Sequence, residues 1–295
     1  MKKLFKAIKQ NDFNEVQRII ESHPEEPELV NSISKAPPKM DEGESALQTA
    51  VKNGGGWHDT RIISYLLDKG ADVNFIQDDK GLRPQEIGCW PVLMYMARAV
   101  YVNATELSCK YAPEKTKAKA NEFMAVFERM LEMGADPNKT DNRLQSVWSM
   151  VLHDGYECHH TGRHEVNNKA YNAFLADVTR RLMDMMIAHG ANIYRYFTSY
   201  PREDPRYADS YFIDLQGQIL INNLVFNRDL TYGLPENARY RAKRKWIDLM
   251  RPYYEKDNPY YGATVSEERK QFFKKLDQLR NEEESTCFGF NKVTI

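Results

Sequence analysis

Five side chains able to bind a metal lie close together near the middle of the sequence. They are four histidines and one cysteine: His153, Cys158, His159, His160 and His164. Imidazole nitrogen and thiolate sulfur are ligands that Zn²⁺ prefers. The run lacks the Cys-x2-Cys or His-x3-His spacing that makes a zinc site predictable. We therefore regard Cys158, His159, His160 and His164 as candidate metal ligands only. The alternative is a solvated loop whose histidines contact a partner.

The known sequence signatures of catalysis are absent. The chain contains no Gly-x-Gly-x-x-Gly, Gly-x4-Gly-Lys-Ser/Thr, Gly-x-Ser-x-Gly or His-Glu-x-x-His. The three glycines at 54–56 follow a helical pattern rather than a strand, so they predict an expanded turn with Trp57 and His58 at its tip. We therefore expect no enzyme and no cofactor. A metal-dependent hydrolase built on the histidine run is kept as an alternative.

A second cluster is basic and aromatic. Residues 239–251 hold six cations against one acid; the cations are Arg239, Arg241, Lys243, Arg244, Lys245 and Arg251. Tyrosines and Trp246 are interleaved with them, which is the composition of single-strand nucleic-acid grooves. Ala238, Ala242, Trp246 and Leu249 also fall on one helical face, which favours a solvated helix with a buried stripe. An acidic protein partner is the third interpretation.

The elements that must position these residues show an internal repeat. Three segments, at 65–74, 129–138 and 184–193, end an apolar helical pattern with Gly and Ala and continue with a polar turn. Gly70, Gly134 and Gly190 stand where a helix C-cap needs a left-handed residue. Three such endings indicate one unit used several times.

The first half of the unit is clearest in residues 41–51. Gly43, Ser45, Leu47 and Ala50 occur in the order of an ankyrin repeat, whose first half carries Gly and then Thr-Pro-Leu-His-x-Ala. Ser45 replaces the Thr and can cap the helix, while Ala46 and Gln48 depart from Pro and His. The chain thus resembles the ankyrin family. A decayed capping unit at the amino end and two further units, near 90–131 and 141–186, carry the same apolar positions.

The resemblance implies an all-α fold, an ankyrin-repeat α-solenoid of four or five helix pairs with a helical C-terminal extension. The spacing from Gly70 to Gly134 is 64 residues and from Gly134 to Gly190 is 56, although ankyrin repeats recur at about 33 residues. We therefore expect surface insertions between the paired helices of the third and fourth units, near 101–119 and 154–168. The repeat stack is expected over 1–197, with a possible fifth repeat and a capping extension over 198–295.

The carboxy-terminal part leaves two alternatives open. Residues 211–250 can form a fifth repeat, or residues 211–226 a β-hairpin followed by a helix. A final amphipathic helix is expected from about Ser266, with an apolar stripe formed by Phe272, Phe273, Leu276 and Leu279. We expect it to cover the open end of the stack, because a solenoid must cap its last apolar face.

Charge and cysteine content suggest where the protein works. The 295 residues carry a net charge of −1, but residues 12–80 hold 14 acids against 7 bases. The four cysteines lie far apart and fit reduced thiols. No apolar run follows the basic start or reaches the length of a membrane span. We therefore expect a location in the cytoplasm, or inside a host cell if the protein is viral or an effector.

The function that the resemblance implies is recognition of another protein without catalysis, with no membrane involved. Ankyrin stacks bind through their turn tips and concave helix face. We expect contacts at Trp57, His58, Phe75, Gln77, Asp79, Lys139, Asn142, Arg143, Tyr194, Arg195, Tyr196 and Phe197. A sharper hypothesis is an inhibitor or immunity-type protein that occludes a partner enzyme. Nucleic-acid binding through 239–254 is the alternative.

Overall fold

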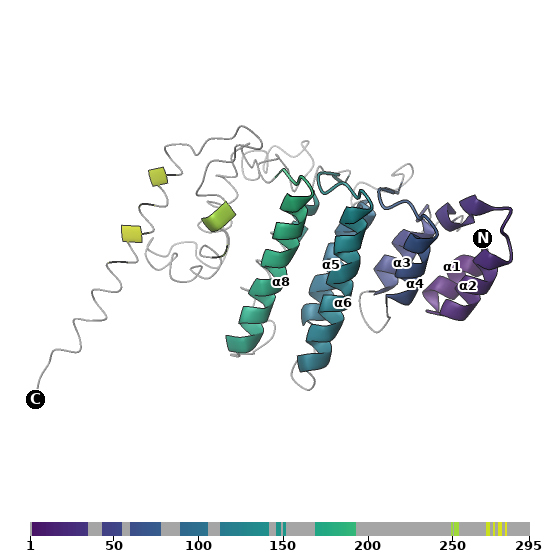
Figure 1. Cartoon of the computed structure of the whole chain (residues 1–295), viewed down its shortest axis with the longest axis horizontal. Helices are drawn as coiled ribbons and strands as arrows, with labels where there is room; N and C mark the ends of the chain where they lie inside the picture. The colour runs from purple at the N-terminus through teal and green to yellow at the C-terminus, as the bar shows by residue number, and fades with distance from the viewer. Residues whose placement is uncertain are drawn as a thin grey trace, which may run out of the picture. The chain divides into compact units, whose positions relative to one another are not determined.

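The computed structural model describes residues 2–34, 43–54, 60–77, 89–105, 113–141, 146–148, 150–151 and 169–192, with further single positions between 249 and 281. The chain divides into two units, residues 1–192 and residues 193–295. In the first unit the helices stand side by side, and the turns that follow α4, α6 and α8 lie along one edge (Figure 1).

The first unit is built from helix pairs arranged in two rows. The first-helix row consists of α1 (Lys2–Lys9), α3 (Ala46–Gly54) and α5 (Val92–Thr105), which contact one another in that order. The second-helix row consists of α2 (Phe13–Glu21), α4 (Arg61–Asp68), α6 (Pro113–Glu132) and α8 (Lys169–Ala188). A short 3₁₀ helix, η1 (Pro27–Asn31), follows α2, and the described residues of 147–151 are also helical. Among the described residues there is no strand, and the predicted all-α solenoid is confirmed.

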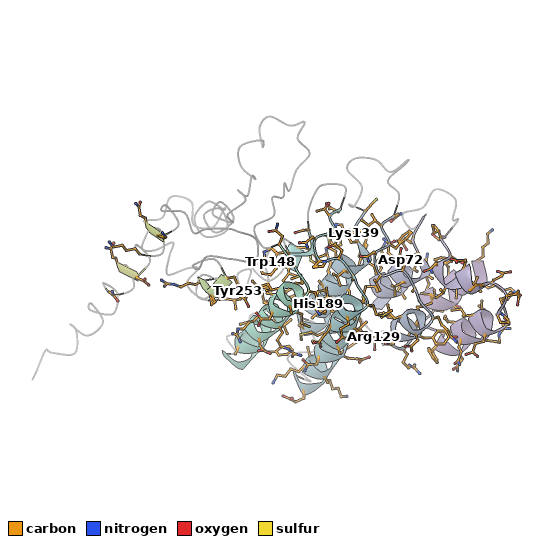
Figure 2. The ribbon with its side chains drawn as sticks, turned by 45° about the horizontal axis from the view of Figure 1, so that its top comes forward. Asp72, Arg129, Lys139, Trp148, His189 and Tyr253 are labelled. Carbon is orange, nitrogen blue, oxygen red and sulfur yellow. The ribbon has the colours of Figure 1, made fainter. Side chains whose placement is uncertain are left out.

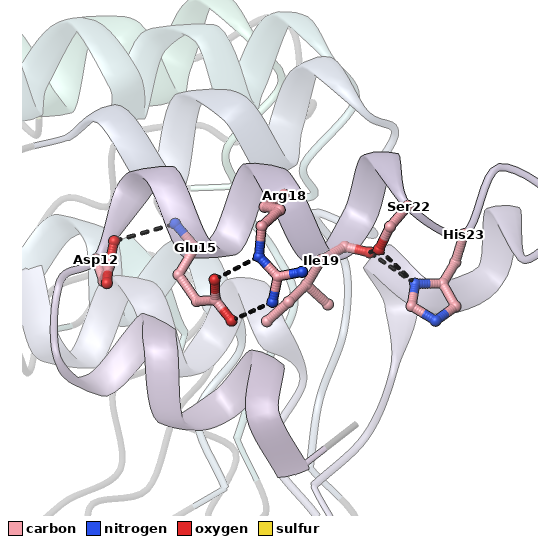
Figure 3. Close-up of polar contacts among 6 residues, drawn as sticks. All are labelled: Asp12, Glu15, Arg18, Ile19, Ser22 and His23. Atoms are coloured by element: carbon pink, nitrogen blue, oxygen red, sulfur yellow. Dashed lines mark hydrogen bonds and ion pairs between the residues drawn. The ribbon is translucent and has the colours of Figure 1, made fainter.

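The amino-terminal pair contains its own capping groups. Asp12 precedes α2 and accepts a hydrogen bond from the Glu15 amide at 3.0 Å (Figure 3). One turn on, the Arg18 guanidinium forms a bidentate pair with Glu15 at 2.7 Å for both bonds. The Ser22 hydroxyl donates to the Ile19 carbonyl at 3.0 Å and so satisfies a carbonyl at the other end. Local side chains therefore close both ends of α2, which lies at the exposed end of the stack.

The best-matched unit folds as its sequence predicts. The Ser45 hydroxyl accepts a hydrogen bond from the Gln48 amide at 3.0 Å, which is the predicted N-cap. Leu47 is 1% exposed and the facing residues of α4 are equally buried. These α4 residues are Ile62, Ile63, Leu66 and Leu67. The helical spacing of the apolar residues therefore located this part of the core correctly.

The third unit differs from the surface insertion expected over residues 101–119. Residues 101–105 continue α5, and residues 113–119 are already helical in α6. Much of the additional sequence thus lengthens both helices, and Tyr101, Ala104 and Thr116 are buried between them and their neighbours. The repeat spacing identified the additional residues but placed them in a loop. Residues 154–168 lie outside the described residues.

A buried polar contact ties the lengthened α5 to the fourth unit. The Tyr101 hydroxyl lies 3.0 Å from Thr179 Oγ1 on α8 and 3.3 Å from the Val151 carbonyl oxygen. Thr179 is fully buried and donates to the Leu175 carbonyl at 3.0 Å. A buried hydroxyl without a hydrogen-bond partner would destabilise the fold. These bonds therefore allow the lengthened α5 to pack against the fourth unit.

The second-helix row is linked by polar side chains as well as by its core. Tyr65 donates to Glu21 at 3.4 Å, Arg129 pairs with Asp68, and Arg181 donates to Asn121 at 2.8 Å. Each link joins one helix of the row to the next. In the same row, Glu122 accepts hydrogen bonds from the Thr60 amide at 3.2 Å and from the Thr60 hydroxyl. A carboxylate from α6 therefore caps the start of α4.

In the second unit the described residues are few, and all of them are helical. Residues 249 and 251–253 belong to one helical segment, and residues 270, 271, 274, 277, 278 and 281 to another. The second segment agrees with the helix expected from about Ser266, and its described residues are exposed or half-buried. The expected fifth repeat or hairpin at 211–226 lies outside the described residues. Across the described residues, no helix combines the length and the apolarity needed to cross a membrane.

Candidate functional site

Three second helices end in the same hydrogen-bonded motif. Gly70, Gly134 and Gly190 have φ values of +84°, +89° and +83°. Each glycine amide bonds back three residues, and the alanine amide that follows bonds back five residues, at 2.8–3.0 Å. This is the Schellman arrangement, in which a left-handed residue allows the last carbonyls of a helix to be satisfied. The predicted helix ends are confirmed.

An asparagine ladder joins these helix ends along the stack. In each rung, an Asn side-chain nitrogen donates to the carbonyl of the next unit's glycine, and its oxygen accepts from the amide two residues later. The rungs run from Asn31 to Gly70 (3.3 Å) and Asp72 (2.8 Å), from Asn74 to Gly134 and Asp136 (both 2.8 Å), and from Asn138 to Gly190 (2.8 Å) and Asn192 (2.6 Å). The turns are therefore held at a fixed spacing.

Within the second and third turns an aspartate fixes the asparagine. The Asp72 carboxylate accepts from the Asn74 amide, and the Asp136 carboxylate accepts from the Asn138 amide, each at 2.8 Å. This is the local turn that Asp side chains favour. Asp72 and Lys139 lie along the same edge of the unit (Figure 2). The Lys139 ammonium also donates to the Asn74 carbonyl, so two neighbouring turns are tied together.

A separate cluster of cations and aromatic rings joins α3 and α5. The Lys52 ammonium lies 5.5 Å from the centroid of the Tyr95 ring, and the Trp90 and Tyr95 ring centroids are 5.1 Å apart. The Arg98 guanidinium lies over Trp90, 5.2 Å from its centroid. These four residues, Lys52, Tyr95, Trp90 and Arg98, are called the cation–aromatic cluster below.

The cluster is anchored by a buried carboxylate. Glu44 is 2% exposed, accepts from the Thr49 hydroxyl at 3.1 Å, and pairs with the Lys52 ammonium. Burial, followed by the negative charge of Glu44, raises the pKa of Tyr95 to about 12. The phenol is therefore neutral at physiological pH. No member of this cluster was predicted from the sequence, although the aromatic and basic residues at the start of α5 and within it were a usable signal.

A family model matches part of the chain. The Ankyrin repeat model matches residues 42–79, which include α3, α4 and the turn that carries Asn74. The chain therefore contains an ankyrin repeat over these residues. The helix ends and the ladder extend the same geometry to the units before and after the matched segment. No curated protein matches the chain.

The turns that follow α4, α6 and α8 form one edge of the stack, called the turn edge below (Figure 1). Two of the contact residues expected on the turns lie on this edge. Phe75 and Lys139 are both half-buried. Gln77 differs, because it is only 6% exposed and packs near Gly43. Its expected place at an exposed tip is therefore wrong, since the turn folds this side chain back against the start of its own repeat. The other expected contacts, Trp57, His58, Asp79, Asn142, Arg143, Tyr194, Arg195, Tyr196 and Phe197, lie outside the described residues.

One member of the basic run is described. The Arg251 guanidinium donates to both carboxylate oxygens of Asp277, at 2.7 and 2.8 Å. This bidentate pair joins the two described helical segments of the second unit. The positive charge of Arg251 is therefore paired with a carboxylate of the same chain. The other members, Arg239, Arg241, Lys243, Arg244 and Lys245, lie outside the described residues.

The histidine run also lies outside the described residues. It comprises His153, Cys158, His159, His160 and His164, so the metal candidates remain a prediction. Within the part of the chain that the structure describes, no group of three His, Cys, Asp or Glu side chains could hold a metal ion.

Proposed function

We propose that this chain is a non-enzymatic protein-binding module that recognises its partner through the turn edge of the ankyrin stack. Ankyrin-repeat stacks are protein-binding modules in general. The observation that carries the proposal is the asparagine ladder, which holds the turns after α4, α6 and α8 in one geometry. A surface that is already ordered loses little conformational entropy when a partner binds.

The turn edge presents side chains suited to contact. Phe75 provides an aromatic surface, and Lys139 provides a charge whose position is fixed by the Asn74 carbonyl. Aromatic residues are enriched where binding energy concentrates. We expect the sequence-predicted tips Trp57, His58, Asn142 and Arg143 to extend the same edge. In its sharper form, the proposal is that occupation of a partner enzyme's surface inhibits that enzyme.

Site-specific photocrosslinking tests the turn edge. A benzophenone side chain at position 75 should crosslink a discrete protein in an extract of the source cells. The matched control is the same group at position 128, where Glu128 is exposed on the second-helix row. Crosslinking at neither position, or equally at both, would contradict the turn edge as the binding surface. For the inhibitor form, the captured partner's activity is measured with and without a stoichiometric amount of this protein.

The nucleic-acid alternative now has less support than the protein-binding proposal. It depends on the basic run at 239–251, and Arg251 directs its guanidinium to Asp277. A ribonuclease- and deoxyribonuclease-resistant crosslink at position 75 would favour a protein partner. A nuclease-sensitive crosslink would favour the alternative.

A further inference from the structure

The charges of the first unit are segregated between its two rows of helices. The first-helix row, α1, α3 and α5, carries six cations and no acid within its described helices; the cations are Lys2, Lys3, Lys6, Lys9, Lys52 and Arg98. All six are exposed. The second-helix row, α2, α4, α6 and α8, carries nine cations and nine acids within its described helices. The first-helix row is therefore a basic surface on an otherwise balanced stack.

Three of these cations occupy the same register in three consecutive units. Each stands five residues after a buried leucine: Lys9 after Leu4, Lys52 after Leu47 and Arg98 after Leu93. The residue immediately before each cation is buried in all three units: Ile8, Val51 and Ala97. Because α1 packs against α3 and α3 against α5, equivalent positions lie one helix apart. We call Lys9, Lys52 and Arg98 the cation row.

The spacing of the cation row is set by helix packing. Neighbouring packed helices have axes about 8–10 Å apart. A polypeptide in the extended polyproline II conformation has three residues per turn and advances about 3.1 Å per residue. Every third side chain of such a segment therefore points to the same side and would meet one cation of the row. Attraction to the helix dipole does not account for all three cations. Arg98 stands in the middle of α5, whereas the dipole acts on the last turn.

Two members of the row are held in place before any ligand binds. Lys52 is fixed by Glu44 and by the Tyr95 ring, yet a third of its side chain remains exposed. Arg98 is stacked on Trp90, which leaves the edge of its guanidinium to donate to a planar anion. An arginine presented in this way fits a carboxylate with two parallel hydrogen bonds.

We propose that the first-helix row binds an acidic polypeptide segment in an extended conformation, with carboxylates facing Lys9, Lys52 and Arg98. This inference rests on the proposed protein-binding function and names the chemistry of the partner. Carboxylates fit better than a single-stranded nucleic acid. Nucleic-acid bases bind by stacking on open aromatic faces, but Lys52 and Arg98 lie over the Tyr95 and Trp90 rings.

Fluorescence anisotropy with the full chain tests this proposal. The probe is a labelled ten-residue peptide with glutamate at every third position and Ser-Gly spacers. It should bind at low salt and lose affinity as salt rises. The double variant Lys9→Glu/Arg98→Glu should weaken binding about tenfold or more, because two attractive pairs become repulsive. Lys52 is left unchanged, since it compensates the buried Glu44.

The controls separate this site from general charge attraction. Lys115→Glu changes an exposed cation of α6 on the second-helix row and should leave the affinity within twofold. A permuted peptide with its four glutamates in succession should bind more weakly. Equal binding by the double variant, equal binding of the permuted peptide, or no binding of either peptide would overturn the proposal.

A second probe decides between the two classes of polyanion. A labelled ten-nucleotide oligothymidylate should bind more weakly than the spaced peptide and should not displace it. Tighter binding of the oligonucleotide, lost in the double variant, would assign the row to nucleic acid instead. Crosslinking at position 75 that persists while the peptide fails would leave the protein-binding function intact and reject only the acidic segment.

Discussion

The side chain of Asn74 connects its own repeat to Gly134, sixty residues further along the chain. Its nitrogen donates to the Gly134 carbonyl at 2.8 Å, while its oxygen accepts from the Asp136 amide at 2.8 Å. One amide thereby satisfies a helix-end carbonyl and a turn amide of the following unit. The same relationship links Asn31 to Gly70 and Asn138 to Gly190.

Replacing Asn74 tests how much this connection stabilises the stack. Asn74→Ala should lower the free energy of unfolding by about 1–2 kcal/mol, because two hydrogen bonds between repeats are lost. Urea denaturation measures the change. The exposed Asn14 on α2 provides the control, and Asn14→Ala should change stability by less than about 0.5 kcal/mol. Equal effects of the two substitutions would contradict a structural role for the ladder.

The left-handed glycines make a separate prediction. Gly134→Ala should destabilise the protein by about 1 kcal/mol, since φ is +89° and a Cβ there would meet no atom within 4 Å. The cost is thus backbone strain without a steric clash. Gly134→Asn should cost less, because Asn tolerates this conformation. Thermal unfolding of both variants provides the measurement. A stabilising alanine would mean that the helix ends in another conformation.

The pairing of Lys52 with buried Glu44 predicts non-additive substitutions. Lys52→Met should cost roughly 2–3 kcal/mol, less than for a fully buried pair because part of Lys52 is exposed. Adding Glu44→Gln should restore more than half of the loss by removing the uncompensated charge. The double-mutant cycle is measured by chemical denaturation.

An exposed pair on another helix serves as the control for this cycle. Lys117 lies 3.1 Å from Glu114 on α6, and the Glu114 side chain is 84% exposed, unlike the buried Glu44. Lys117→Met should therefore change stability by less than about 0.5 kcal/mol. If Lys52→Met behaves like Lys117→Met, the burial of Glu44 has no energetic consequence and the prediction is wrong.

The raised pKa of Tyr95 predicts that the protein loses stability in alkaline solution. Its folded pKa is about 12, against 10.0 for an ordinary tyrosine. Between these values the folded state holds a proton that the unfolded state has lost, so stability falls as pH rises from about 10 to 12. Tyr95→Phe should flatten this part of the profile. The measurement is the denaturation midpoint of both proteins from neutral pH to pH 12, and parallel profiles would contradict the prediction.

Local sequence patterns predicted much of the first unit. Ser45 was identified as a cap, Leu47 and the apolar residues of α4 as core, and Gly70, Gly134 and Gly190 as helix ends. Each depends on residues within about one helical turn of one another, so spacing alone is informative. The same reasoning misplaced residues 101–119. Repeat spacing counts additional residues but does not say whether they lengthen helices or form a loop.

The sequence by itself determined the repeat, its helix ends, its apolar face and the uneven distribution of charge. Only the tertiary structure decided which distant groups meet: Asn74 with Gly134, Glu122 with the start of α4, and Tyr101 with Thr179. It also decided that Gln77 is buried and that the helices carrying Lys9, Lys52 and Arg98 pack in one row. The physical reason is that a helix cap or an apolar stripe is specified within a few residues. Contacts between repeats depend instead on how whole helices pack, and their partners are separated by some 40–80 residues of sequence.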